Sequence, residues 1–82
     1  MPEQDTRDYV GLDIAKSQLD YAIAETNEGQ LPYSSNGLTE LVEKVRQLPR
    51  PCVICESTGG YERRVLEVLL KAGIEVCLVM PG

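Results

Sequence analysis

Hydrophobic and polar positions alternate with two different periods along the chain, and these periods predict its elements. Apolar runs at residues 9–13, 52–56 and 75–80 are typical of strands buried on both faces. Residues 19–25 alternate between apolar and polar side chains, which predicts a strand with one buried face. Residues 30–34 predict a short strand, and Pro32 marks it as an edge strand because proline cannot donate to a neighbour. The pattern therefore predicts five strands.

Two segments show helical spacing instead. The first has an apolar stripe and is preceded by Asn36, a plausible N-cap; the stripe is Leu38, Leu41, Val42, Val45 and Leu48. The second is predicted to begin within residues 57–61 and to end at Gly73; its buried stripe is Val65, Leu66, Val68, Leu69 and Ala72. Turns are predicted at residues 14–18 and at residues 26–29, where Gly29 would take a positive φ.

The order of these elements predicts a topology. The first three strands should pair as an antiparallel meander, and right-handed crossovers should bring the last two parallel to the first. The expected fold is α/β, with a mixed sheet in the order 3-2-1-4-5 and two helices. Asp13 and Glu56 each end an apolar strand, and these two strands become neighbours. We therefore predict that two carboxylates meet at the C-terminal edge of the sheet, where open α/β sheets bind ligands.

Composition narrows the chemistry of that edge. The 82 residues make one domain at most, and the net charge of −5 argues against this chain alone being a nucleic-acid clamp. Histidine is absent, so a bound metal would have oxygen ligands, which favours Mg²⁺ or Mn²⁺ over zinc. The structural alternative is that Asp13 and Glu56 are ordinary capping or turn acids.

The cysteines and the N-terminus suggest no separate site. Cys52 and Cys55 lie three apart in a strand and should point to opposite faces, so buried, reduced thiols are expected. Residues 1–8 are polar and predict a flexible lead-in rather than a signal peptide. No apolar run is long enough to span a membrane, and a cytoplasmic, nucleoid-associated location is expected.

Candidate phosphate-binding residues surround the two acids. Lys16 follows Asp13 by three residues, and Thr58, Gly59 and Gly60 lead into a helix N-terminus, where free amides can hold an anion. Arg63 and Arg64 come next and are candidates for a nucleic-acid backbone. A solvated lysine, a tight glycine turn and exposed arginines explain the same residues without any ligand.

Two motifs resemble those of a known family. Residues 9–16, Tyr-Val-Gly-Leu-Asp-Ile-Ala-Lys, and residues 55–62, Cys-Glu-Ser-Thr-Gly-Gly-Tyr-Glu, are similar to the N-terminal domain of the DEDD insertion-sequence transposases, relatives of the Piv DNA invertase. The resemblance covers residues 9–81 and implies a RuvC-like, RNase H-like fold. It also implies that four acids bind divalent metal for DNA strand cleavage and exchange. Asp13 matches the first catalytic acid and Glu56 the second.

The resemblance also implies parts beyond residue 82. The last two acids form a D-x-x-D pair further along, and a separate domain carries a nucleophilic serine. Most of the surface for DNA, and for the guide RNA that some members use, is expected there too. We therefore expect residues 9–82 to be the N-terminal part of a catalytic domain, to bind metal weakly and to be inactive alone. Met80 stands where members often have asparagine.

The sequence leaves two alternative functions open and also predicts self-association. Actin-like sugar kinases and ATPases begin with a similar strand, although Ala15 and Lys16 replace their glycine-containing turn. A non-catalytic interaction module is the second alternative. The apolar fifth strand has few charges to discourage pairing, which predicts a homo-oligomer built on that strand or on its adjoining sheet face.

Overall fold

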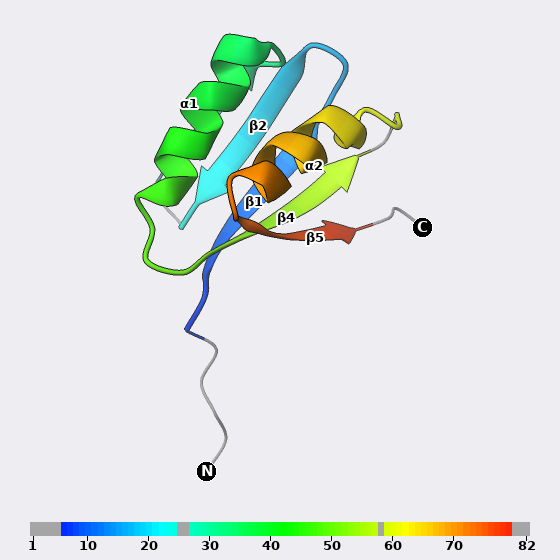
Figure 1. Ribbon diagram of the computed structural model, residues 1–82. Coiled ribbons are helices and arrows are strands. Elements are labelled where there is room, and N and C mark those ends of the chain that lie inside the picture. Colours follow the sequence, from blue (N-terminus) through cyan, green and yellow to red (C-terminus); the bar gives the residue numbers. More distant parts are fainter. Residues whose placement is uncertain (1–5, 25–26, 58, 80–82) are drawn as a thin grey trace.

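A mixed sheet forms the centre of the computed structural model, which describes residues 6–24, 27–57 and 59–79. Within these residues the sheet has five strands in the order β3-β2-β1-β4-β5, as predicted. The strands are β1 (Asp8–Ile14), β2 (Gln18–Ile23), β3 (Asn27–Pro32), β4 (Pro51–Ser57) and β5 (Glu75–Val79). β1, β2 and β3 pair antiparallel, while β4 runs parallel to β1 and β5 parallel to β4. Figure 1 shows β2, β1, β4 and β5 in this order.

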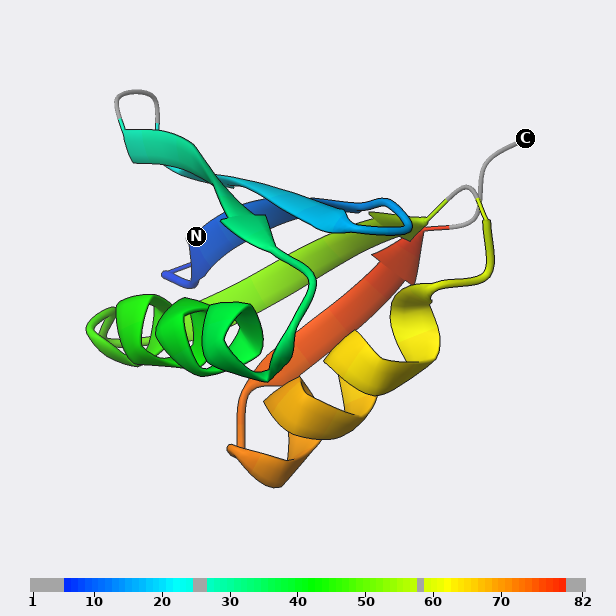
Figure 2. The same ribbon diagram turned by 90° about the horizontal axis from the view of Figure 1, so that it is seen from above.

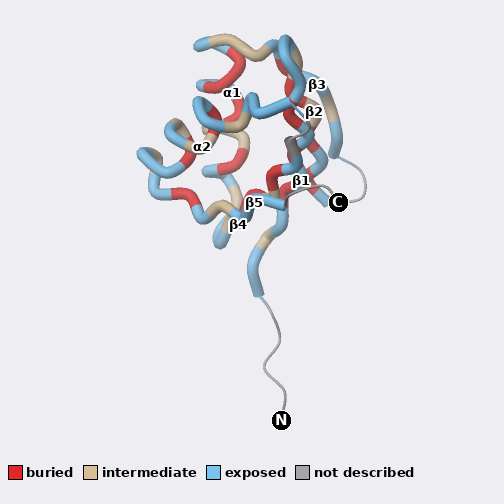
Figure 3. Tube along the Cα trace, turned by 90° about the vertical axis from the view of Figure 1, so that its right-hand side faces the viewer, coloured by how far each residue is buried: buried red, intermediate tan, exposed pale blue. Residues whose placement is uncertain are grey.

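Two helices, α1 (Ser35–Arg46) and α2 (Glu62–Lys71), cover the same face of the sheet. Figure 2 shows both helices on one side of the strands. The core lies between the helices and this face, and Figure 3 shows the buried segments there. Its fully buried side chains include Val10, Ile14, Leu19, Leu41, Val45, Val53, Val65 and Leu69. The opposite face carries no helix in the described part of the chain, and we call it the open face.

The hairpin between β2 and β3 differs from its prediction. Asn27, Glu28 and Gly29 belong to β3, and the chain turns earlier, where Ala24 has a φ of 59°. Residues 25 and 26 lie outside the described residues. Gly29 does not take a positive φ but pairs with Tyr21, whose Oη would lie 2.7 Å from a Cβ at that position. A side chain at this position would therefore have to displace the tyrosine ring.

The start of α1 also differs from its prediction. Ser34, not Asn36, is the N-cap, and its Oγ accepts a hydrogen bond from the Gly37 amide at 3.2 Å. Asn36 lies inside the first turn. Gly37 packs so closely on β3 that a Cβ would overlap the carbonyl oxygen of Pro32. We infer that the packing of Gly37 on β3, and not the presence of Asn36 in the sequence, determines where α1 begins.

The second helix begins at Glu62, and its N-cap Tyr61 makes no side-chain capping bond. Its C-terminus has the predicted glycine: Gly73 has a φ of 76° and donates to the Leu70 carbonyl at 3.0 Å. The next amide, of Ile74, donates to the Leu69 carbonyl at 3.0 Å, which completes a Schellman motif. This motif directs the chain into β5. None of the described helices is long and apolar enough to cross a lipid bilayer.

Candidate functional site

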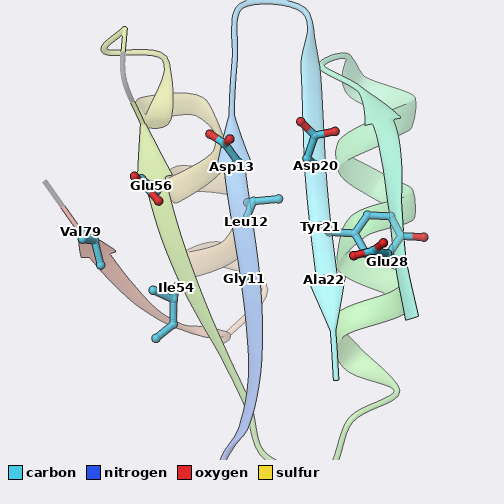
Figure 4. Close-up of a pocket in the computed structure, with 10 residues that line it drawn as sticks. All are labelled: Gly11, Leu12, Asp13, Asp20, Tyr21, Ala22, Glu28, Ile54, Glu56 and Val79. Carbon is cyan, nitrogen blue, oxygen red and sulfur yellow. The ribbon is translucent and has the colours of Figure 1, made fainter. Parts of the chain in front are cut away.

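Asp13 and Glu56 lie side by side on the two central parallel strands. They are register partners in the β1–β4 ladder, and each is one residue from the C-terminal end of its strand. Their neighbours Leu12 and Cys55 are buried against the helices, so the alternation of a strand turns both acids to the open face. Figure 4 shows the two carboxylates on adjacent strands. Both residues are exposed to solvent.

A third acid, Asp20, extends this pair and was missed in the sequence. It is the register partner of Asp13 in the β1–β2 hairpin, on the other side of β1 from Glu56. The side-chain amide of Gln18 donates to Asp20 Oδ1 at 2.8 Å and holds the carboxylate in place. Glu56, Asp13 and Asp20 thus form a row across three strands, visible in Figure 4, which we call the acidic row.

Asp20 could have been identified from the length of the first turn. The Ala15 amide donates to the Gln18 carbonyl at 3.0 Å, so only residues 15–17 connect the two strands. This short connection sets Ile14 opposite Leu19 and therefore Asp13 opposite Asp20. The predicted turn over residues 14–18 was too long to establish the register. The sequence signal was present in the alternation of polar Asp20 with buried Leu19 and Tyr21.

A shallow depression of about 390 Å³ lies beside the acidic row on the open face. Figure 4 shows the residues that line it. Besides the acidic row and a fourth acid, Glu28, its lining includes Gly11, Ala22, Ile54 and Val79, so part of its floor is apolar. A Cβ on Gly11 would meet only the Ala22 carbonyl, at 4.0 Å, so the absence of a side chain there leaves space next to Asp13. A flat, open surface of this kind suits a large substrate better than an enclosed small molecule.

The donor set of the acidic row fits a hard divalent cation in part. Carboxylate oxygens are the ligands that Mg²⁺ and Mn²⁺ prefer. Among the described residues, however, no group of three His, Cys, Asp or Glu side chains is arranged to hold a metal ion. Asp13 and Glu56 alone would give an ion two protein ligands, and Mg²⁺ commonly keeps several waters.

The predicted phosphate-binding residues share the C-terminal edge of the sheet with the acids. Lys16 is exposed in the turn that follows β1, and Arg63 is exposed in the first turn of α2. Gly59 and Gly60 are exposed between β4 and α2, and Gly60 has a φ of 75°, which glycine tolerates best. Thr58 lies outside the described residues.

Hydrogen bonds anchor the loop that follows Glu56 to the start of α1. The Tyr33 hydroxyl donates to the Tyr61 carbonyl at 2.5 Å, and burial raises the pKa of that hydroxyl. In the first turn of α2, the Arg64 guanidinium donates to Ser35 Oγ at 2.7 Å. Arg64 therefore has a structural partner, and Arg63 is exposed at the same helix end. These contacts connect the start of α2 to the start of α1.

The cysteines do not take part in the acidic row. Cys52 pairs with Tyr9 and Cys55 with Leu12, three residues apart on opposite faces, and both are buried and in no disulfide, as expected. Burial, and to a lesser extent the neighbouring Cys77, raises the pKa of the Cys55 thiol to about 11. Cys55 is therefore a protonated core residue at neutral pH. Cys77 is exposed on β5.

The comparisons with known proteins agree with the fold and with the motifs. The family model of the IS110-type DEDD transposases, described as a transposase, matches residues 10–82. No curated protein matches the chain. The described residues form seven helices and strands. The matched segment contains all of them except the first two residues of β1. The mixed sheet in the order 3-2-1-4-5 with two helices is the RNase H-like arrangement expected for this family, and the chain belongs to the IS110-type DEDD transposases.

Proposed function

We propose that this chain is the N-terminal part of a transposase catalytic domain that cleaves and exchanges DNA strands with a divalent metal. The observation that carries the proposal is the pairing of Asp13 with Glu56 at the C-terminal strand ends of an exposed face. Both carboxylates are exposed, so they add nothing to the packing of the core. The ion pairs among the described residues include no basic partner for either of them. A cation would compensate their charge. The actin-like kinase alternative is set aside because the matched family is a transposase family.

Asp13 and Glu56 are the residues proposed to hold Mg²⁺ or Mn²⁺. A metal bound there would supply a Lewis acid that polarises a phosphodiester oxygen and activates a nucleophile. The contribution of the chain itself is positional. Rigid neighbouring strands set the distance between the two carboxylates, and Gly11 leaves room beside Asp13 for a bulky polymer. The remaining acids of the family, and its serine nucleophile, are proposed to come from a segment beyond residue 82.

The partners proposed for the open face are DNA and the guide RNA that some members of the family use. Lys16, Thr58, Gly59, Gly60 and Arg63 are proposed to contact phosphates at the edge of the sheet. The chain is acidic, with a net charge of −5, so these few contacts would position a strand while other parts of the protein supply most of the affinity. The proposal also includes self-association of the chain.

Calorimetric titration with Mg²⁺ and Mn²⁺ tests the metal part of the proposal. Weak binding is expected for the chain, and Asp13→Asn and Glu56→Gln should each reduce it strongly because each removes half of the protein ligands. Glu28→Gln is a matched control: Glu28 lines the same depression but pairs with Ala22 rather than with an acid. If Asp13→Asn and Glu56→Gln bind metal as well as the wild type, the site lies elsewhere.

A DNA-cleavage assay on a longer protein that includes the family's D-x-x-D pair tests the activity. Asp13→Asn should abolish cleavage in Mg²⁺ while leaving DNA binding in a gel-shift assay unchanged or slightly tighter, because a negative charge is lost. Cleavage at the wild-type rate by this variant would assign the chain to a non-catalytic role. Loss of DNA binding together with cleavage would show that Asp13 acts through the fold and not through metal.

A further inference from the structure

The outer edge of β5 differs from the opposite edge of the sheet in ways that favour pairing. Edge strands are normally protected from pairing by proline, by charges or by bulges. The β3 edge has such protection in Pro32 and Glu28. β5, Glu-Val-Cys-Leu-Val, has one charged residue, and the Glu75 carboxylate is already engaged by the Arg7 guanidinium at 2.7 Å. Figure 1 shows β4 on one side of β5 and no strand on the other.

Exposed apolar side chains collect at this same edge. On β5, Leu78 is 36% and Val79 43% exposed, and on α2 Leu70 is 62% exposed. Leu66 and Leu70 lie four residues apart and therefore share one side of α2. Val68 and Lys71 line a depression together with α1 residues, so they define the side of α2 that faces α1. Leu66 and Leu70 consequently face the other way, above the free edge of β5.

We propose that a second copy of this chain docks on β5 by antiparallel edge-to-edge pairing, with a two-fold axis at Cys77. This inference gives the proposed self-association a defined interface and does not depend on metal binding. Cys77 is the middle residue of β5, so this register pairs all five residues of the strand in each copy. Val76 then faces Leu78 of the other copy on the side of the helices, where Leu70 of each copy extends the apolar contact.

Charge selects this register among the alternatives. With the axis at Cys77, Glu75 lies opposite Val79 of the second copy, so the two Glu75 side chains are separated by the length of the strand. A shift of the axis to Glu75 would place two carboxylates directly opposite each other, which is unfavourable. Each copy carries a net charge of −5, so long-range repulsion opposes association. Association should therefore become tighter as salt screens that repulsion.

The Cys77 thiol provides a direct test of the register. In an antiparallel pair, opposite Cα atoms are about 4.5–5.5 Å apart, which is within the roughly 4.4–6.8 Å span of a disulfide. Diamide would take up two protons and two electrons from the two Cys77 thiols as their S–S bond forms. Cys52 and Cys55 are buried and should not compete. We expect rapid formation of a covalent dimer of the wild type, and none for Cys77→Ser.

A shifted thiol controls for random collision. In Cys77→Ser/Val79→Cys the new thiol faces Glu75 of the second copy, and the two new thiols are about 13 Å apart along the strands, too far for a disulfide. Cross-linking at the wild-type rate by this variant would overturn the register.

Sedimentation under reducing conditions tests the association itself. The wild type and Cys77→Ser should both be dimeric at micromolar concentration, and Val79→Glu should be monomeric because it faces Glu75 of the second copy. Gln30→Glu introduces the same charge on the protected edge and should stay dimeric. A monomeric wild type at all salt concentrations would overturn the self-association, while a dimer that Val79→Glu leaves intact would overturn only the interface. Either result can occur with metal binding unchanged, so the two proposals fail separately.

Discussion

Asp13 is the central charge of the acidic row, and its replacement by asparagine should stabilise the metal-free chain. Glu56 flanks it on β4 and Asp20 on β2, each directly opposite in register. Charges that face each other on neighbouring strands are roughly 5–6 Å apart. At that distance in water two unit charges repel by about 0.7–0.8 kcal/mol. With two such neighbours, Asp13→Asn should raise the free energy of unfolding by about 1.5 kcal/mol at low salt.

Salt and the flanking acids provide the internal checks. The Debye length at physiological ionic strength is about 8 Å, so the gain should fall to roughly half there. Glu56→Gln removes one of the two repulsions and should give about half the stabilisation of Asp13→Asn at the same salt concentration. Glu28→Gln, on the same face but opposite Ala22, should change stability little. Urea unfolding followed by circular dichroism measures all four proteins.

Mg²⁺ should cancel this difference in stability. A ligand present at ten times its Kd stabilises the folded state by about 1.4 kcal/mol, and only the wild type should gain this. Asp13→Asn would then lose its advantage when Mg²⁺ is added. A variant that is less stable than the wild type without metal would refute the electrostatic reasoning. Equal stabilisation of both proteins by Mg²⁺ would refute the assignment of Asp13 as a ligand.

Three further predictions concern the core, a helix start and a buried thiol. Leu69→Ala should lower the free energy of unfolding by about 2–5 kcal/mol, because Leu69 is fully buried on the core side of α2; chemical denaturation measures the loss. Gly37→Ala should destabilise the chain although alanine favours helices, because its Cβ would overlap the Pro32 carbonyl oxygen; a variant with a higher melting temperature would contradict this packing. Burial raises the pKa of the Cys55 thiol from 9.0 to about 11, so the folded state retains its proton where the unfolded state loses it. Stability from this residue should therefore be complete below pH 9 and decline between pH 9 and 11, a decline that Cys55→Ala should lack in pH-dependent melting curves.

The architecture was predictable because its signals are strong and agree with one another. The apolar runs that end at Asp13 and Glu56 have strand length, and the segment between Ser57 and Gly73 can only cross over between parallel strands. Right-handed crossovers through α1 and α2 then place β4 beside β1 and β5 beside β4. The pairing of the two acids follows from this topology. Gly73 was also correctly assigned, because glycine with a positive φ at a helix C-terminus is a local requirement.

The features that were not predicted depend on contacts between distant residues. Ser34, Ser35 and Asn36 are all capable of capping a helix, and the packing of Gly37 on Pro32 decides among them. Gly29 has the sequence environment of a turn, yet the ring of Tyr21 occupies the space beside it. Asp20 was overlooked because its position next to Asp13 depends on the register of a hairpin, which a difference of one residue in loop length would change.

The β1–β4 ladder also connects the candidate site to the order of folding. Asp13 and Glu56 are 43 residues apart in sequence (56 − 13), so they become neighbours only when the meander and α1 are already enclosed by this pairing. We expect a contact between residues so far apart in sequence to form late in folding, because closing the intervening loop costs conformational entropy. A chain that has formed only its local hairpin and helices therefore has two separate carboxylates and no paired site. Amide exchange of the β1–β4 hydrogen bonds would report directly the fraction of molecules in which the pair is assembled.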